Sequence, residues 1–188
     1  GLTQVIELEE DSYLEYLPEP TIPCRHTRFI ADTAIRIAPS ASLFYSEIYM
    51  SGRKYFDRGE TFQYDILSVC SHAERPDGEQ LFREKFIIRP EMYPPSTLGA
   101  MNGYDVFANV IVLTPPEHAD SIYDRTQAFI DRDRRLAAGI TRLPNDAGLL
   151  YKVLGEETAP VKKLIREFCS SVRQEVKGKP LPEEFPWR

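Results

Sequence analysis

The sequence has no long apolar run and few cysteines, and these shortages exclude several classes of protein. No stretch approaches the roughly 20 apolar residues that cross a bilayer, so we expect no membrane partner. The first five residues lack the basic and apolar parts of a signal peptide, which favours a cytoplasmic location. Cys24, Cys70 and Cys169 are odd in number and have no C-x-x-C spacing, so no disulfide framework is expected.

The sequence also lacks an excess of positive charge and the motifs of common enzymes. Acidic residues outnumber Lys and Arg by 29 to 23, whereas a nucleic-acid surface needs clustered Lys and Arg. There is no G-x-S-x-G nucleophile elbow, no phosphate-binding P-loop and no H-E-x-x-H pair. These absences predict a protein that binds other proteins, does not bind nucleic acid and is not an enzyme of these classes.

The length and composition suit one globular domain. The 188 residues include 42% hydrophobic side chains, enough to bury a sizeable core. We expect this domain to span residues 1–178, followed by a proline-rich tail at 179–188.

The first two-thirds of the chain has the two-residue periodicity of β-strands. Residues 26–37 show it most clearly, because apolar and charged side chains alternate there. Further strands are expected at residues 3–9, 13–17, 42–50, 60–70, 80–89, 104–113, 136–143 and 149–154, separated by turn residues.

Two helices are expected toward the C-terminus. Apolar residues at helical spacing follow Thr158, the predicted N-cap, and the stripe ends before Gly178. A second helix is predicted from about Pro115 to Arg134, with Thr114 as its cap and with Phe129 and Ile130 facing inward. The order of elements predicts a mainly β protein with added helices, not an alternating α/β fold.

Three sequence blocks occur in a fixed order: Leu-Pro-Glu-Pro-Thr-Ile-Pro at 17–23, the stretch with two glycine turns at 46–65, and Thr-Arg-Leu-Pro-Asn-Asp-Ala-Gly at 141–148. Together they resemble the urease accessory protein family UreD, called UreH in some organisms, and the resemblance covers nearly the whole chain. It implies stacked, solenoid-like β-layers with two helices near the C-terminus. It also implies a preceding β-rich segment that is absent from this chain.

The resemblance implies a non-enzymatic scaffold for urease maturation. Such a protein would bind the accessory protein UreF, join the GTPase UreG, and dock on the urease apoprotein to assist nickel insertion. It would hold no cofactor tightly, although nickel could pass through it. Two alternatives stay open: a stand-alone interaction module without metal handling, and a hydrolase or isomerase that uses Asp and Glu pairs.

Glu47 is the sharpest candidate for a functional carboxylate. It shares a strand face with Leu43, Tyr45 and Tyr49, and a carboxylate on an apolar face must be paired or protonated. Arg53 is the nearest plausible partner. Glu47 is therefore either half of a structural ion pair with Arg53 or a residue lining a polar path that nickel could follow.

The glycine turns supply three further candidates. Glu60 follows Gly59 and matches the Gly-Glu pair of the family; it either caps the turn or belongs to the site with Glu47 and Arg53. Gly52 and Gly59 are expected to have positive φ angles and to shape the site without touching a ligand.

Cys24 with His26, and Cys70 with His72, form two C-x-H pairs whose side chains share a strand face. Two such strands side by side would offer four metal ligands. The simpler interpretation is that Cys24 replaces an aromatic residue of the family and that the histidines lie near strand ends in solvent. We therefore predict no tight metal site.

Partner binding is assigned to the last helix and to the tail. Phe168 and Val172 lie on the apolar stripe of the helix, and the tail carries Phe185 and Trp187, which are residue types enriched at interface hot spots. The alternative is a tail that packs on its own domain. The resemblance favours contact with UreF.

Overall fold

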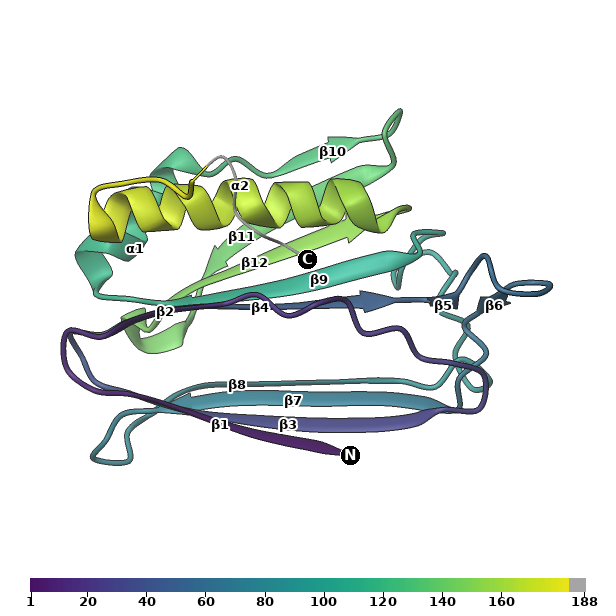
Figure 1. Cartoon of the computed structure of the whole chain (residues 1–188), viewed down its shortest axis with the longest axis horizontal. Helices are drawn as coiled ribbons and strands as arrows, with labels where there is room; N and C mark the ends of the chain where they lie inside the picture. The colour runs from purple at the N-terminus through teal and green to yellow at the C-terminus, as the bar shows by residue number, and fades with distance from the viewer. Residues whose placement is uncertain (183–188) are drawn as a thin grey trace.

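The computed structural model describes residues 1–182, which form two stacked β-sheets with two helices over one of them (Figure 1). The four-stranded sheet has the order β1 (Leu2–Leu8), β3 (Arg28–Ile37), β7 (Ile66–Glu74), β8 (Gln80–Ile88). The six-stranded sheet has the order β10 (Phe129–Asp131), β11 (Leu136–Arg142), β12 (Gly148–Gly155), β9 (Val106–Leu113), β4 (Ser42–Met50), β2 (Tyr13–Tyr16). The strands β5 (Gly52–Arg53) and β6 (Glu60–Thr61) form a separate hairpin.

The chain passes back and forth between the two sheets from β1 to β7. In consequence β1, β3 and β7 are parallel neighbours in one sheet, and β2 and β4 are parallel neighbours in the other. The remaining pairs are antiparallel. The expected mainly β fold with two helices is confirmed, whereas this alternation ends at β7 and does not confirm a solenoid.

Helix α2 (Thr158–Lys177) covers the outer face of the six-stranded sheet. Its apolar stripe is buried there, and the centres of the Phe168 and Tyr151 rings are 4.3 Å apart. The predicted C-terminal end of α2 is confirmed, since Gly178 has a φ of 71° and donates its N–H to the carbonyl of Gln174. The predicted cap is wrong by one residue: Glu157 occupies the N-cap position and Thr158 is the first helical residue.

Helix α1 (Pro116–Arg125) is shorter than predicted. Thr126 is extended, and Phe129 and Ile130 belong to β10, where Phe129 lies opposite Ala138 of β11. The helical assignment failed because adjacent apolar residues suit an edge strand as well as a helix end. Thr114 is not the cap of α1; its hydroxyl hydrogen-bonds that of Ser42 at 2.7 Å.

The predicted strand at 60–70 is divided into β6 and β7. Phe62 has a φ of 54°, which an extended strand cannot accommodate, and the chain turns there before Ile66. The short 3₁₀ turn at Pro144–Asp146 lies between β11 and β12.

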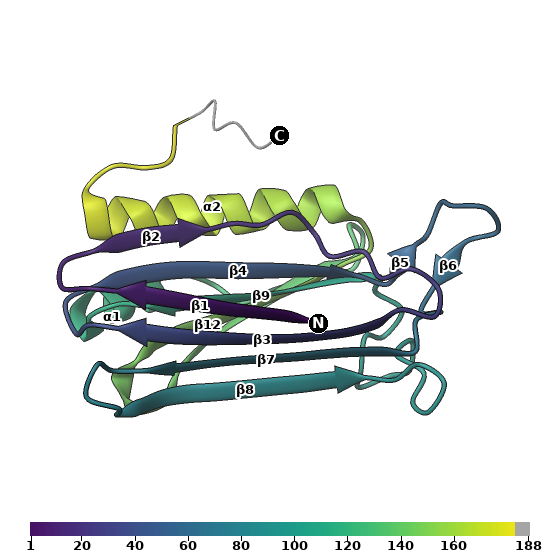
Figure 2. The same ribbon diagram turned by 60° about the horizontal axis from the view of Figure 1, so that its bottom comes forward.

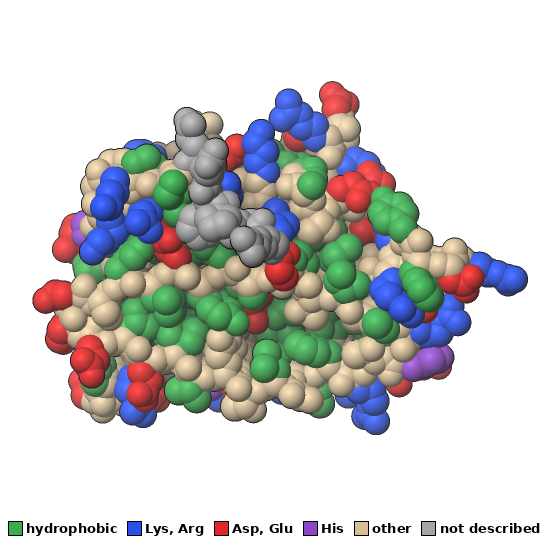
Figure 3. Space-filling model, viewed as in Figure 1, with side chains coloured by type: hydrophobic (Ala, Val, Ile, Leu, Met, Phe, Trp, Pro, Cys, Tyr) green, Lys and Arg blue, Asp and Glu red, His purple; other side chains and the backbone are tan. Residues whose placement is uncertain are grey.

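Two apolar clusters fill the space between the sheets, one toward each end. The first includes Ile35, Ile37, Leu43 and Ile111, and the second is built around Tyr49, Leu67 and Val69. Burying each large aliphatic side chain contributes about 1.5–3 kcal/mol, so these clusters hold the sheets together. On the face seen in Figure 3, apolar side chains form a band between the sheets.

Among the described residues, no helix combines the length and apolar composition needed to span a bilayer.

Candidate functional site

A row of polar side chains crosses the interior between the two apolar clusters. In the four-stranded sheet, the strand register places Gln4 beside Thr33, Thr33 beside Ser71, and Ser71 beside Glu84. In the six-stranded sheet, Asn109 lies between Glu47 and Lys152. We call these seven residues the interior polar row: Gln4, Thr33, Ser71, Glu84, Glu47, Asn109 and Lys152.

Side chains of the row meet across the gap between the sheets. The Asn109 amide donates to a Glu84 carboxylate oxygen at 3.5 Å, and Lys152 forms an ion pair with the same carboxylate. The hydroxyls of Thr33 and Tyr45 are 3.1 Å apart. Thr33 and Asn109 are buried, with exposed fractions of 1% and 5%. Buried polar groups of this kind are costly unless they are hydrogen-bonded, so the row is held in place by its contacts.

Glu47 lies at one end of the row, where it lines a cavity together with Tyr45 and Tyr49. Burial raises the pKa of Glu47 above its ordinary value, the two tyrosine hydroxyls oppose that shift, and the negative charge of Glu84 adds to it. The predicted ion pair between Glu47 and Arg53 is wrong. Arg53 lies outside the interior and pairs with Glu60 instead.

The two ends of the row line separate cavities on opposite sides of the sandwich. A cavity of about 70 Å³ is lined by Gln4 and Glu47 beneath the edge strands β1 and β2. Figure 2 shows these two strands on the side that faces the viewer. A larger cavity of about 440 Å³ lies beside β8 and is lined by Asn109, Lys152 and apolar residues such as Phe86. Polar groups thus run through the interior from one open side to the other.

Replacing Glu47 with glutamine is expected to change how stability depends on pH. Because the pKa of Glu47 is raised by folding, the folded chain holds this proton more tightly than the unfolded chain. The stabilisation is therefore present at low pH and is lost as pH rises from the ordinary value of 4.5 through the raised pKa. Urea unfolding at several pH values should show the parent losing stability relative to Glu47→Gln over this range. A constant difference would mean that Glu47 has an ordinary pKa.

The hairpin β5–β6 projects from one end of the molecule (Figure 1). Its central contact is a two-pronged ion pair, in which Arg53 Nε and Nη2 donate to the Glu60 carboxylate at 2.7 and 2.8 Å. The backbone N–H of Arg25 also donates to Glu60, at 3.3 Å. The Arg53 guanidinium lowers the pKa of Glu60. Glu60 and Glu47 thus have separate partners and do not form an acid/base pair.

Gly52 and Gly59 have the backbone geometry that the sequence predicted. Their φ angles are 141° and 86°. A Cβ atom at position 52 would lie 1.9 Å from the carbonyl oxygen of Glu60, so no other residue fits without moving the backbone.

Two aromatic residues at the hairpin tip, Tyr55 and Phe56, are 78% and 52% exposed. The Arg53 guanidinium carbon lies 3.9 Å from the centre of the Phe56 ring, and the Tyr55 hydroxyl donates to Glu157. The tip is therefore an ordered and exposed surface that also carries cations.

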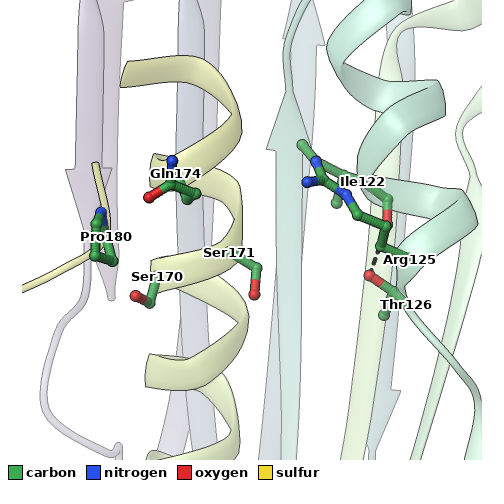
Figure 4. A pocket seen from close by; sticks show the side chains of 7 residues that line it. All are labelled: Ile122, Arg125, Thr126, Ser170, Ser171, Gln174 and Pro180. Carbon is green, nitrogen blue, oxygen red and sulfur yellow. Dashed lines mark hydrogen bonds between the residues drawn. The ribbon is translucent and has the colours of Figure 1, made fainter. Parts of the chain in front are cut away.

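A groove of about 280 Å³ lies between the two helices (Figure 4). Arg125 and Thr126 line it from the end of α1, and Ser170, Ser171 and Gln174 line it from α2. Beside the groove, Glu175 accepts hydrogen bonds from Ser121 and His118 and pairs with Arg125, which holds α1 against α2.

The partner-binding assignment of Phe168 and Val172 is corrected by their burial. Their exposed fractions are 5% and 0%, because both side chains pack in the chain's own core under α2. The apolar stripe of α2 was predicted to bind a partner because helical periodicity shows that a face is apolar. It does not show whether that face packs within the chain or against another protein.

The first described residues of the tail pack against α2. Leu181 is 7% exposed and belongs to the core, and its N–H donates to Ser170. The candidate residues Phe185 and Trp187 lie outside the described residues.

The two C-x-H pairs do not converge on one metal site. In the register between β3 and β7, Arg28 lies opposite Ile66 and Cys70 lies opposite Asp32, so Cys24 and His26 precede the paired region. His26 contacts Asp65, whereas Cys70 and His72 lie near Asp32.

Sequence reasoning missed most of the polar row. Thr33 belongs to the alternating stretch at residues 26–37 and was given no role, and Ser71, Glu84, Asn109 and Lys152 were not singled out. One signal was present: Asn109 interrupts the inward positions of β9, between Phe107 and Ile111. Its neighbours in the row depend on which strands pair, and sequence alternation does not reveal the pairing.

The sequence was compared with known families and curated proteins. Residues 1–188 match the family model described as UreD urease accessory protein. Urease accessory protein UreD 2 of Brucella suis biovar 1 (strain 1330) is 51% identical over 185 residues, which cover 98% of this chain and 61% of the relative. Urease accessory protein UreD of Yersinia enterocolitica is 46% identical over 191 residues, covering 98% of this chain and 59% of the relative. The chain thus spans about three-fifths of the length of these relatives.

Proposed function

The chain belongs to the UreD family of urease accessory proteins, and on this premise we propose that it is a non-enzymatic scaffold that assists nickel insertion into urease. The observation that carries the proposal is the interior polar row, which lies between apolar clusters and whose ends line cavities on both sides of the sandwich. A core built only for stability would not need Thr33, Ser71 and Asn109 at its centre, because a buried polar group costs free energy.

The row has the chemistry for brief contact with a divalent cation. Glu47 and Glu84 offer carboxylates at its two ends, and Thr33, Ser71 and Asn109 offer neutral oxygens between them. Nickel is bound by oxygen and imidazole ligands as well as by thiolates, and spaced oxygen ligands hold a passing ion without trapping it. The ion pair with Lys152 partly neutralises Glu84, which further weakens the hold at that end.

Protein partners follow from the proposed role. We assign UreF, the GTPase UreG and the urease apoprotein as partners, since a passage through this chain is useful only between a donor and an acceptor. The groove between α1 and α2 is the surface offered to UreF, and the exposed hairpin tip is offered to the other two partners. Because Phe168 and Val172 are buried, contact with UreF is assigned to the groove and to the tail that follows it.

Co-expression with UreF is expected to yield a stable complex by size-exclusion chromatography. Removing residues 183–188 should weaken this complex by at least about 2 kcal/mol, or roughly thirtyfold in Kd, because the segment contains Phe185 and Trp187. The truncation keeps Leu181, so the core packing against α2 is retained.

A Tyr55→Ser variant serves as the matched control, because it removes an exposed aromatic residue at the hairpin, on a different part of the surface. It should bind UreF as the parent does. Failure of the parent to form a complex would overturn the proposed scaffold role. If the truncated and parent chains bind UreF with equal affinity, the tail is not part of the interface.

A further inference from the structure

Three metal-ligating side chains meet on the outer face of the four-stranded sheet, away from the polar row. Asp32 lies on β3, and Cys70 and His72 lie on β7, with Cys70 directly opposite Asp32. One ligand atom from each residue lies within 4.8 Å of the other two. The donors are a thiol, an imidazole and a carboxylate, a combination that suits borderline transition metals such as zinc and nickel.

His72 supplies an independent observation. Its Nδ1 atom is buried and has no hydrogen-bond partner among the described residues, although it lies 3.5 Å from a carboxylate oxygen of Asp32. Buried ring nitrogens are normally hydrogen-bonded or ligate a metal. A cation between Nδ1, the Asp32 oxygen and the Cys70 sulfur would satisfy this atom.

We propose that Asp32, Cys70 and His72 bind a divalent transition-metal ion of the zinc and nickel class. The ion enters from solvent past Asp32, whose side chain is 50% exposed, and reaches the buried thiol of Cys70. The thiol releases its proton to solvent as the metal–sulfur bond forms, and water completes the coordination. Metal binding at this site does not depend on the nickel passage proposed for the interior polar row.

Neighbouring charges keep the ion exchangeable. Lys85 of β8 lies opposite Cys70, and Arg83 lies opposite His72, so two cations occupy the adjoining strand. Their positive charge disfavours a bound metal cation, and among residues 1–182 the cluster offers three protein ligands. The sequence alone predicted no tight metal site, and the proposed site departs from that prediction by holding one exchangeable ion.

Equilibrium titration with Ni²⁺ and with Zn²⁺ tests the proposal directly. The 188-residue chain is expected to bind one ion, and Ni²⁺ should produce a thiolate-to-metal charge-transfer absorption. Cys70→Ser should abolish this absorption, and each of Cys70→Ser, His72→Ala and Asp32→Asn should weaken binding by roughly tenfold or more.

The other C-x-H pair provides matched controls. Cys24 and His26 are exposed, so Cys24→Ser and His26→Ala remove the same ligand types without touching the cluster. Both variants should bind as the parent does. The proposal is overturned if the parent binds neither ion, if the cluster variants bind unchanged, or if the control variants lose binding equally. Asp32→Asn, on the exposed side of the cluster, keeps the test valid if Cys70→Ser fails to fold.

Discussion

Replacing Gly52 with alanine is expected to lower the free energy of unfolding by at least about 3 kcal/mol. The new Cβ would lie 1.9 Å from the Glu60 carbonyl oxygen, and the φ of 141° is unfavourable for any side chain. Relief requires the β5–β6 backbone to separate, which also breaks the Arg53–Glu60 ion pair. Thermal unfolding should show a decrease in Tm of about 6–12 °C for a chain of this size.

Gly78→Ala is the matched control. Gly78 also has a positive φ, 93°, but a Cβ atom there would meet no atom of the described residues within 4 Å. This variant should carry only the backbone strain, about 1 kcal/mol, and a correspondingly smaller decrease in Tm. If the two variants lose equal stability, the close approach of Gly52 to Glu60 does not matter for the fold.

Replacing Glu47 with leucine is expected to leave the fold intact while lowering urease activation by roughly tenfold or more. The partly buried Glu47 carboxylate costs free energy because it loses water contacts on folding, and this desolvation also raises its pKa. Leucine removes that cost, and the gain offsets the lost interactions with Tyr45 and Tyr49. Stability should therefore stay within about 1 kcal/mol of the parent value. Activation should fall because leucine puts an apolar group where a passing cation needs an oxygen ligand.

Activation is measured in cells that carry urease and the other accessory proteins, with this chain as the only member of its family. Glu7→Leu is the matched control, because Glu7 is an exposed carboxylate of β1 that pairs with Arg36 outside the interior. That variant should support activation as the parent does. Normal activation with Glu47→Leu would show that Glu47 is not part of a required passage.

The sequence predicted those features that depend on neighbours along the chain. The strand at Ser42–Met50 has the expected bounds, and helix α2 ends where expected and begins one residue earlier, because alternation and helical spacing are local patterns. The two glycine turns were recognised for the same reason, since positive φ is a property of single residues. The family was recognised from three short blocks and is confirmed by the match over residues 1–188.

Features that depend on strand pairing could not be predicted. Arg53 was matched to Glu47 because the two are close in sequence, yet the hairpin register places it opposite Glu60. Cys70 and His72 were compared with Cys24 and His26, whereas the parallel pairing of β3 and β7 supplies Asp32. The interior polar row has one part in each sheet, and these two parts face each other only after the sheets have stacked. Register and sheet packing are therefore the information that local patterns lack.

If the interior polar row carries nickel as we propose, the nickel content of purified urease tests that role most directly. Urease matured with the parent chain or with Glu7→Leu should contain the same amount of nickel. Urease matured with Glu47→Leu should contain roughly tenfold less, while the complex between this variant and UreF still forms. Equal nickel content in all three preparations would contradict the account.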